Sequence, residues 1–266
     1  MKRFLPLLLL LLMPAAQAFM GTSQNAPALT QIRPTAVAAA NGGLPADCSQ
    51  AIIGITEGWN SSQVTLCMVE RRADGRWARV LGPFPGRLGY NGAVWGRGLH
   101  TAPRGAVLKT ESDGRSPVGI FALGGLWVTN KQPVQHDPRM PMVKVGPNDL
   151  WISDTRMPQY YNRHMRLSHP AATAWEKHEQ MRQTDYPHSI KMLICHNTER
   201  PVNNGGSAVF FHIWRRNGEA ATAGCTSMAE ENLRALIARV NTQRHPVYIL
   251  LPREEYQQRR ALWRLP

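Results

Sequence analysis

The chain has 266 residues, of which 43% are hydrophobic, and it carries a formal net charge of +13. This length suits one large domain or two small ones. Beyond the N-terminus no segment offers the roughly 20 consecutive apolar residues that span a bilayer, so we expect no transmembrane segment. A charge this positive predicts attraction to an anionic surface.

The first 18 residues have the pattern of a secretory signal. Lys2 and Arg3 precede a short apolar run, and Ala16-Gln17-Ala18 is a small-x-small cleavage site. Cleavage after Ala18 predicts a periplasmic or secreted protein. Export argues against nucleic acid as the anionic partner and favours the anionic polymers and lipid headgroups of the cell envelope.

The rest of the chain reads as a linker, one domain and a short tail. Residues 19–47 are rich in Ala, Gly, Pro, Thr and Asn, which predicts a linker without a core, so ordered structure is expected to begin near Cys48. Apolar runs between turn signals predict strands at 51–55, 64–69, 77–81, 118–123, 150–153, 190–195, 208–213 and 247–251. Helical spacing occurs at about 170–182 and 228–241. Many short strands with about two flanking helices predict a single mainly-β domain over 48–252, a β-sandwich or barrel. The basic tail at 253–266 is either a surface helix or a frayed end.

Four cysteines would lie in an oxidising compartment. Cys48 and Cys67 flank a predicted hairpin with strands at about 50–56 and 62–70, which predicts a disulfide worth about 3 kcal/mol. Cys195 lies in an apolar strand and is expected to be a small core residue. Cys225 remains as the accessible thiol.

Cys225 and His212 have the pattern of a cysteine nucleophile and its base. The thiol follows a small-residue turn, Ala221-Thr222-Ala223-Gly224, and the imidazole lies in the apolar run Phe210-Phe211-His212-Ile213-Trp214. Ser227 and Glu230 have capping-box spacing, which predicts a helix beginning directly after Cys225. Free N–H groups and the positive end of the helix dipole would then favour a thiolate. The backbone N–H groups of Gly224 and Cys225 are predicted to hold an oxyanion. The alternative is a buried structural cysteine beside a strand histidine.

A second polar segment precedes a predicted strand. Gly114-Arg115-Ser116-Pro117 forms a turn from which Arg115 projects, either as a surface charge or as a bidentate ligand for a substrate carboxylate. The loop that contains Trp151, Asp154, Tyr160, Tyr161, Asn162 and Arg163 is expected either to line a cleft or to cover one end of the domain.

Two of these segments resemble the L,D-transpeptidase catalytic-domain (YkuD-like) family of the bacterial cell wall. His212 with Thr222-Ala223-Gly224-Cys225-Thr226-Ser227-Met228 is similar to that family's His and Ser/Thr-His-Gly-Cys segment, and Gly114-Arg115-Ser116-Pro117-Val118-Gly119-Ile120-Phe121 is similar to its Gly-Arg-Thr-Pro-x-Gly-x-Phe element. The resemblance covers residues 48–252 in element order. It implies catalysis by Cys225 and His212, with the backbone carbonyl after His212 orienting the imidazole.

The resemblance also implies a substrate class. It implies a thioester at Cys225, formed from a peptidoglycan stem peptide with a diaminopimelate-like L-centre and a terminal D-amino acid. Trp214, Thr226 and Ser227 would contact the substrate, and no cofactor or metal is expected. Ala223 and Ser227 stand where the family has His and Arg, so Arg115, Arg215 or Arg216 would have to meet the substrate carboxylate.

Two other functions are compatible with these residues, and two further ones are disfavoured. An L,D-carboxypeptidase or endopeptidase would use water in place of an amine acceptor. A non-catalytic basic wall-binding module would need no activated thiol. A zinc site of Cys195, His196, His212 and Cys225 is disfavoured because Cys195 and His196 are adjacent in a strand and point to opposite faces. Papain-like peptidases place Cys before His, which is the opposite order.

Overall fold

A computed structural model describes residues 28–39, 42–182 and 184–266, so the predicted signal at 1–18 lies outside the described residues. The chain is mainly β, as predicted. Its strands are β1 Ala28–Leu29, β2 Gln50–Thr56, β3 Gln63–Arg71, β4 Trp77–Arg87, β5 Ala93–Trp95, β6 Ser116–Val128, β7 Met142–Lys144, β8 Asp149–Trp151, β9 His164–Arg166, β10 Ile190–Ile194, β11 Phe210–Ile213, β12 Thr226–Met228 and β13 Val247–Pro252. Its helices are α1 Ala174–Glu179, α2 Glu230–Arg239 and α3 Arg253–Arg259, with 3-10 turns η2 Tyr186–His188, η3 Arg216–Gly218 and η4 Thr242–Arg244.

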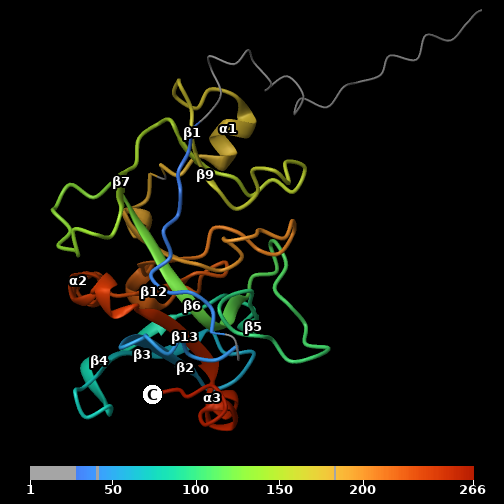
Figure 1. Ribbon diagram of the computed structural model, residues 1–266. Coiled ribbons are helices and arrows are strands. Elements are labelled where there is room, and N and C mark those ends of the chain that lie inside the picture. The colour runs from blue at the N-terminus through green and yellow to red at the C-terminus, as the bar shows by residue number, and fades with distance from the viewer. Residues whose placement is uncertain (1–27, 40–41, 183) are drawn as a thin grey trace, which may run out of the picture.

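Eight of the strands close into a barrel (Figure 1). Their order is β10-β11-β12-β4-β3-β2-β13-β6, and β6 pairs again with β10, so none of the eight is left as a free edge. β6 closes the circle because its 13 residues are long enough to pair with β13 along one part and with β10 along another. All of these residues are buried, which explains their almost continuous apolar sequence.

A smaller sheet of order β1-β9-β8 lies with α1 at one end of the molecule, away from β2, β3 and α3 (Figure 1). Within the described residues, ordered structure begins before the expected start near Cys48. β1 pairs with β9, and the Thr35 hydroxyl donates a hydrogen bond to the Pro246 carbonyl at 2.6 Å. Ala36 and Leu44 are buried against the barrel, which supplies the core that this segment lacks.

The described residues contain three short helices where about two were predicted. α1 is shorter than the predicted 170–182 because Thr173 caps it: the Thr173 hydroxyl accepts from the Glu176 N–H at 3.2 Å, and the Glu176 carboxylate accepts from the Thr173 N–H at 2.9 Å. α3 begins the tail at 253–266, and Trp263 behind it is buried. No helix within 28–39, 42–182 and 184–266 is long and apolar enough to cross a membrane.

The predicted capping box at Ser227 and Glu230 was wrong. Ser227 lies in β12, which pairs with β11 and β4, and α2 begins at Glu230 behind Ala229 without a side-chain cap. Pairing between distant strands therefore overrides the local capping signal. As a result, Cys225 precedes a strand, and the predicted stabilisation of its thiolate by a helix N-terminus does not apply.

The predicted Cys48–Cys67 disulfide was also wrong, because all four cysteines are free. The register pairs Cys67 with Ile53 in the middle of β2, whereas Cys48 precedes the first residue of that strand, Gln50. Cys195 is a buried core residue, as predicted.

Candidate functional site

A row of paired side chains crosses the outer face of the barrel. The row runs over β6, β10, β11, β12, β4 and β3 through Trp127, Lys191, His212, Ser227, Arg87 and Gln63. Directly paired residues of a sheet point to the same face, so His212 lies between Lys191 and Ser227. Lys191, His212 and Ser227 are all buried under the covering loops.

The alternate residues of β11 and β12 point into the barrel. The rings of Phe211 and Tyr248 pack with centroids 4.6 Å apart, and the Thr226 and Tyr248 hydroxyls are hydrogen-bonded at 3.1 Å. Thr226 is therefore buried inside the barrel, away from the face that carries His212. The predicted contact of Thr226 with a substrate does not fit this position.

His212 is oriented by the backbone, as the resemblance implied. Its Nδ1 lies 2.7 Å from the Ile213 carbonyl oxygen, so Nδ1 carries the proton and Nε2 remains as the basic nitrogen. The His188 ring stacks on it with centroids 4.6 Å apart, and His188 Nδ1 is bonded in turn to the Asp185 carboxylate at 2.9 Å. Burial, aided by neighbouring His188, lowers the pKa of His212 to about 3, so the imidazole is neutral at physiological pH.

Cys225 lies directly before β12, next to Phe210 of the parallel strand β11. Its Sγ accepts from the Phe210 N–H at 3.4 Å and donates to the Ala208 carbonyl at 3.5 Å. The parallel register places Cys225 on the face of β12 that also carries Ser227, so the thiol and His212 share the outer face of adjacent strands. The residue is partly exposed. Burial of the sulfur raises the pKa of the thiol, against the opposing effects of the Phe210 N–H and two lysines.

Two hydroxyl groups fix the turn that carries Cys225. The Thr222 hydroxyl donates to the Cys225 carbonyl at 2.7 Å and accepts from the Gly224 N–H at 3.1 Å. The Ser116 hydroxyl donates to the same carbonyl at 3.0 Å. Gly224 has φ +144°, and a Cβ there would lie 2.9 Å from the Arg115 carbonyl oxygen, so glycine is required.

Of the two backbone N–H groups predicted as oxyanion donors, these contacts leave one available. The Gly224 N–H is already bonded to Thr222, whereas the Cys225 N–H makes no hydrogen bond within the described part of the chain. Ser227 beside His212 is buried, and its hydroxyl has no partner among the described residues. It does not reach the surface where a substrate would lie.

The turn that contains Arg115 adjoins the turn that carries Cys225. Its backbone carbonyl faces Gly224, and its side chain donates to the Ala93 carbonyl at 3.2 Å. The guanidinium lines a cavity of about 500 Å³ with mainly apolar walls. The walls include Trp59, Ala93, Val94, Trp95, Ala106 and Leu108. Arg115 is thus a cation at the edge of an apolar pocket next to the turn that carries Cys225.

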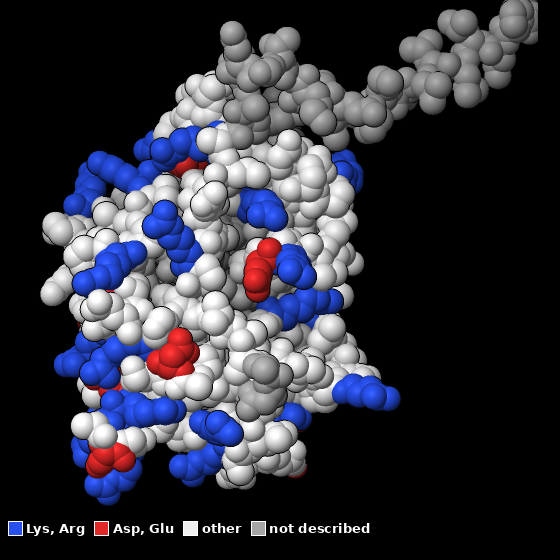
Figure 2. Space-filling view, viewed as in Figure 1, with Lys and Arg blue, Asp and Glu red and all other residues white. Residues whose placement is uncertain are grey.

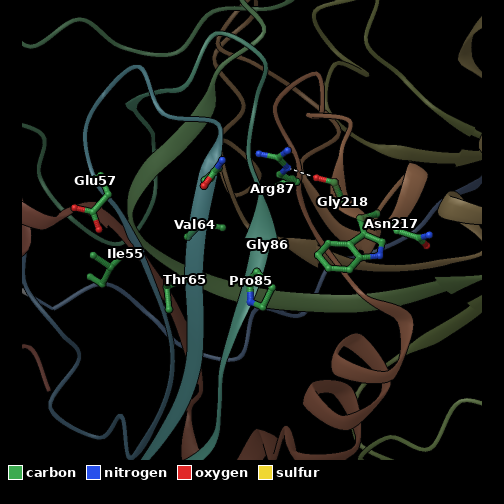
Figure 3. Close-up of a pocket in the computed structure, with 11 residues that line it drawn as sticks. Ile55, Glu57, Val64, Thr65, Pro85, Gly86, Arg87, Asn217 and Gly218 are labelled. Atoms are coloured by element: carbon green, nitrogen blue, oxygen red, sulfur yellow. Dashed lines mark hydrogen bonds between the residues drawn. The ribbon is translucent and has the colours of Figure 1, made fainter.

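Trp214 lies at a second cavity, of about 400 Å³, over the outer faces of β2, β3 and β4 (Figure 3). Arg87 lies beside Gly218 at one side of this cavity and donates a hydrogen bond to the Gly218 carbonyl (Figure 3). Asn217 and Glu57 lie on opposite sides of the cavity (Figure 3). Arg87 pairs with Ser227 in the sheet, so the row of paired side chains that contains His212 extends to the wall of this cavity.

The polar-aromatic loop after β8 has a packing role. The Trp151 indole donates to the Asn162 side-chain carbonyl at 3.0 Å, and the Asn162 amide donates to the carbonyls of His196 and Asn197. The Tyr161 hydroxyl is bonded to Glu111. These bonds tie the small sheet to the loops of the barrel. Asp154 and Trp175 nevertheless line a further open cavity near Glu111.

Two buried lysines were missed by the sequence analysis. Lys109 Nζ donates to the Asp113 carboxylate at 2.6 Å and to the Arg115 carbonyl at 2.7 Å, next to Gly224. Lys191 Nζ donates to the Met181 carbonyl at 2.8 Å. The signal for Lys191 was available in the sequence, because a charge within the apolar run 190–194 has to be buried or placed at a site.

The described residues contain no group of three or more His, Cys, Asp or Glu side chains placed to hold a metal ion. Comparisons of the chain with protein-family models, with curated proteins and with solved structures found no match. The resemblance of its two segments to the L,D-transpeptidases therefore remains a prediction.

Proposed function

We propose that this protein is an exported cysteine-dependent acyltransferase that acts on peptidoglycan stem peptides by L,D-transpeptidation. The observation that carries the proposal is the placement of Cys225 and His212 on the same face of adjacent parallel strands. The Ile213 carbonyl holds Nδ1 of His212, which leaves Nε2 to take up a proton.

The reaction has two acyl-transfer steps. Sγ of Cys225 attacks a peptide carbonyl carbon while Nε2 of His212 takes the thiol proton. The C–N bond then breaks, the leaving D-amino acid receives that proton, and a thioester remains on Cys225. An amine acceptor attacks the thioester and forms a new amide, which restores the thiol. Water in place of the amine gives the free acid, which is the carboxypeptidase or endopeptidase alternative.

The turn geometry supports stabilisation of the oxyanion by one backbone donor. The Cys225 N–H is unpaired within the described residues and lies at the reacting atom, whereas the Gly224 N–H is occupied by Thr222. A carboxylate of the peptide would be recognised by Arg115, whose guanidinium uses one N–H on the Ala93 carbonyl and faces an apolar cavity. Trp214 would contact the peptide from the other cavity.

The surface charge agrees with a polymer of the cell envelope as partner. Figure 2 shows Lys and Arg side chains spread over the visible face with few Asp or Glu between them. A distributed positive charge favours adsorption to an extended anionic polymer over recognition of a single small anion. A non-catalytic wall-binding module would share this property, so the thiol chemistry has to decide between the two functions.

The test is incubation of the mature protein with wall tetrapeptides, with and without an amine acceptor, followed by mass analysis of the products. We expect loss of the terminal D-amino acid, formation of a crosslinked product, and an acyl adduct on the Cys225 peptide. Cys225→Ala should abolish all three with an unchanged melting temperature. Turnover retained in this variant would exclude Cys225 as the nucleophile. Hydrolysis without crosslinking would select the carboxypeptidase.

Arg115→Lys tests recognition of the carboxylate. The substitution retains the charge but loses the planar fork of the guanidinium. We expect kcat/KM to fall by about tenfold or more, which is about 1.4 kcal/mol, with little change in melting temperature. A lower melting temperature with unchanged kcat/KM in the folded variant would give Arg115 a purely structural role.

A further inference from the structure

Lys191 is a buried cation that has no carboxylate bound to it among the described residues. It lies in the middle of β10, its side chain is 3% exposed, and the hydrogen bond found for its Nζ goes to the neutral Met181 carbonyl. An ammonium group is costly to bury without an opposite charge. A negative charge that forms near the Lys191 ammonium would therefore reduce the free-energy cost of its burial.

The sheet directs Lys191 to the face that carries the candidate nucleophile. Lys191 pairs with His212, and Cys225 adjoins Phe210 on the same face of the neighbouring strands. Lys191 and Cys225 are close enough for the charge of each to favour the charged form of the other. The other charged or titratable groups that face them are Lys109, Asp113, His164, Asp185, His188, His212 and Arg215.

Lys109 is the other cation near the thiol, and its charge is already paired. The Asp113 carboxylate lies 2.6 Å from Lys109 Nζ, so the two charges form a dipole beside Gly224. Lys109 favours the thiolate of Cys225, as does Lys191. Only Lys191 combines this effect with the lack of a bound carboxylate.

We propose that Lys191 is a positioning residue that stabilises the thiolate of Cys225 from the same outer face of the sheet. The inference rests on the proposed role of Cys225 as nucleophile. It concerns the thiol alone, so it is tested without any wall substrate.

The proposal predicts a distinctive pH dependence. Burial lowers the pKa of Lys191 to about 8, while the thiol has a raised pKa, so the two groups titrate as a coupled pair. Below pH 8 the thiolate fraction rises tenfold per pH unit. Above pH 8 the pair has lost one of its two protons, and the remaining proton is distributed between the amine and the thiol. The thiolate fraction then stays level until this second proton leaves.

The experiment is alkylation of the folded full chain with iodoacetamide from pH 6 to pH 10, with modification of the Cys225 peptide followed by mass. We expect the logarithm of the wild-type rate constant to rise with unit slope and to level off near pH 8. Lys191→Gln, which retains a donor for Met181, should lose the plateau and react at least about tenfold more slowly at pH 7, equal to about 1.4 kcal/mol.

Two controls separate charge from packing. Lys191→Arg retains a cation that does not titrate in this range, so it should keep the wild-type rate at pH 7 with unit slope throughout. Lys144→Gln removes an exposed lysine of β7 and should leave the profile unchanged. A wild-type profile without a plateau would overturn the proposal. A rate constant for Lys191→Gln within twofold of wild type at pH 7 would also overturn it. If the glutamine variant does not fold, Lys191→Met takes its place in this comparison. Failure of transpeptidation with a normal plateau would instead count against the proposed substrate.

Discussion

The turn that carries Cys225 depends on one side chain, Thr222, and its removal has a calculable cost. Thr222→Val retains the shape of the side chain and removes its hydroxyl. The variant loses the 2.7 Å bond to the Cys225 carbonyl and the 3.1 Å bond from the Gly224 N–H. The carbonyl retains its bond from Ser116, whereas the Gly224 N–H is left without a partner in a buried position.

The expected loss of stability follows from these two bonds. Loss of a hydrogen bond lowers the free energy of unfolding by about 1 kcal/mol net, and a buried N–H left without a partner lowers it by about 1–3 kcal/mol. Because Ser116 still satisfies the carbonyl, we place the total near the lower end, at about 2 kcal/mol. For a chain of this size this lowers the melting temperature by about 4–8 °C.

Differential scanning calorimetry measures the stability, and acylation of Cys225 measures the function. Thr222→Ser is the matched control because it keeps the hydroxyl and loses only a methyl group. We expect the serine variant to melt close to wild type and to acylate normally, and the valine variant to melt lower and acylate more slowly. A melting temperature for Thr222→Val within 1 °C of wild type would refute the assignment of these bonds as the support of the turn.

Three further predictions concern the base, acid stability and the thiols. His212→Gln should slow acylation by about 10²–10⁴-fold in single-turnover experiments, the usual contribution of a general base, and a rate within a few-fold of wild type would leave His212 a structural role. Burial lowers the pKa of His100 to about 4 and of His196 and His212 to about 3, whereas the unfolded chain binds these protons below about pH 6.5. The free energy of unfolding should therefore fall as the pH drops from 6.5 towards 4, and urea titrations that give equal stability at both pH values would contradict the burial of neutral histidines. Denatured protein should alkylate at four cysteines without reductant, and a peptide that joins Cys48 to Cys67 would contradict the register of β2 and β3.

Local patterns in the sequence were sufficient to predict most of the barrel strands. Runs of apolar and β-branched residues located β2, β3, β10 and β13 almost to the residue. The short strands β5, β7, β9 and β12 were missed because each has three residues, too few for a pattern of alternation. β12 was predicted as the start of a helix because Ser227 and Glu230 have capping spacing, and only its pairing with two distant strands makes it β.

The roles of individual site residues depended on information that the sequence does not carry. Thr226 and Ser227 are adjacent, and only the register with β11 determines that Thr226 points into the barrel and Ser227 towards His212. Arg115 was expected to project from its turn, and only the fold shows that its carbonyl approaches Gly224 while its side chain bonds to the Ala93 carbonyl. Such placements depend on contacts between segments that only the fold brings together, which no local pattern records.

The environment of the candidate pair indicates how the proton moves. Burial raises the pKa of the Cys225 thiol and lowers that of His212, so both shifts disfavour a thiolate–imidazolium pair in the resting site. His212 would then take the proton as the C–S bond forms. During attack the ammonium of Lys191 would stabilise the charge on sulfur, and the Cys225 N–H would stabilise the charge that develops on the carbonyl oxygen.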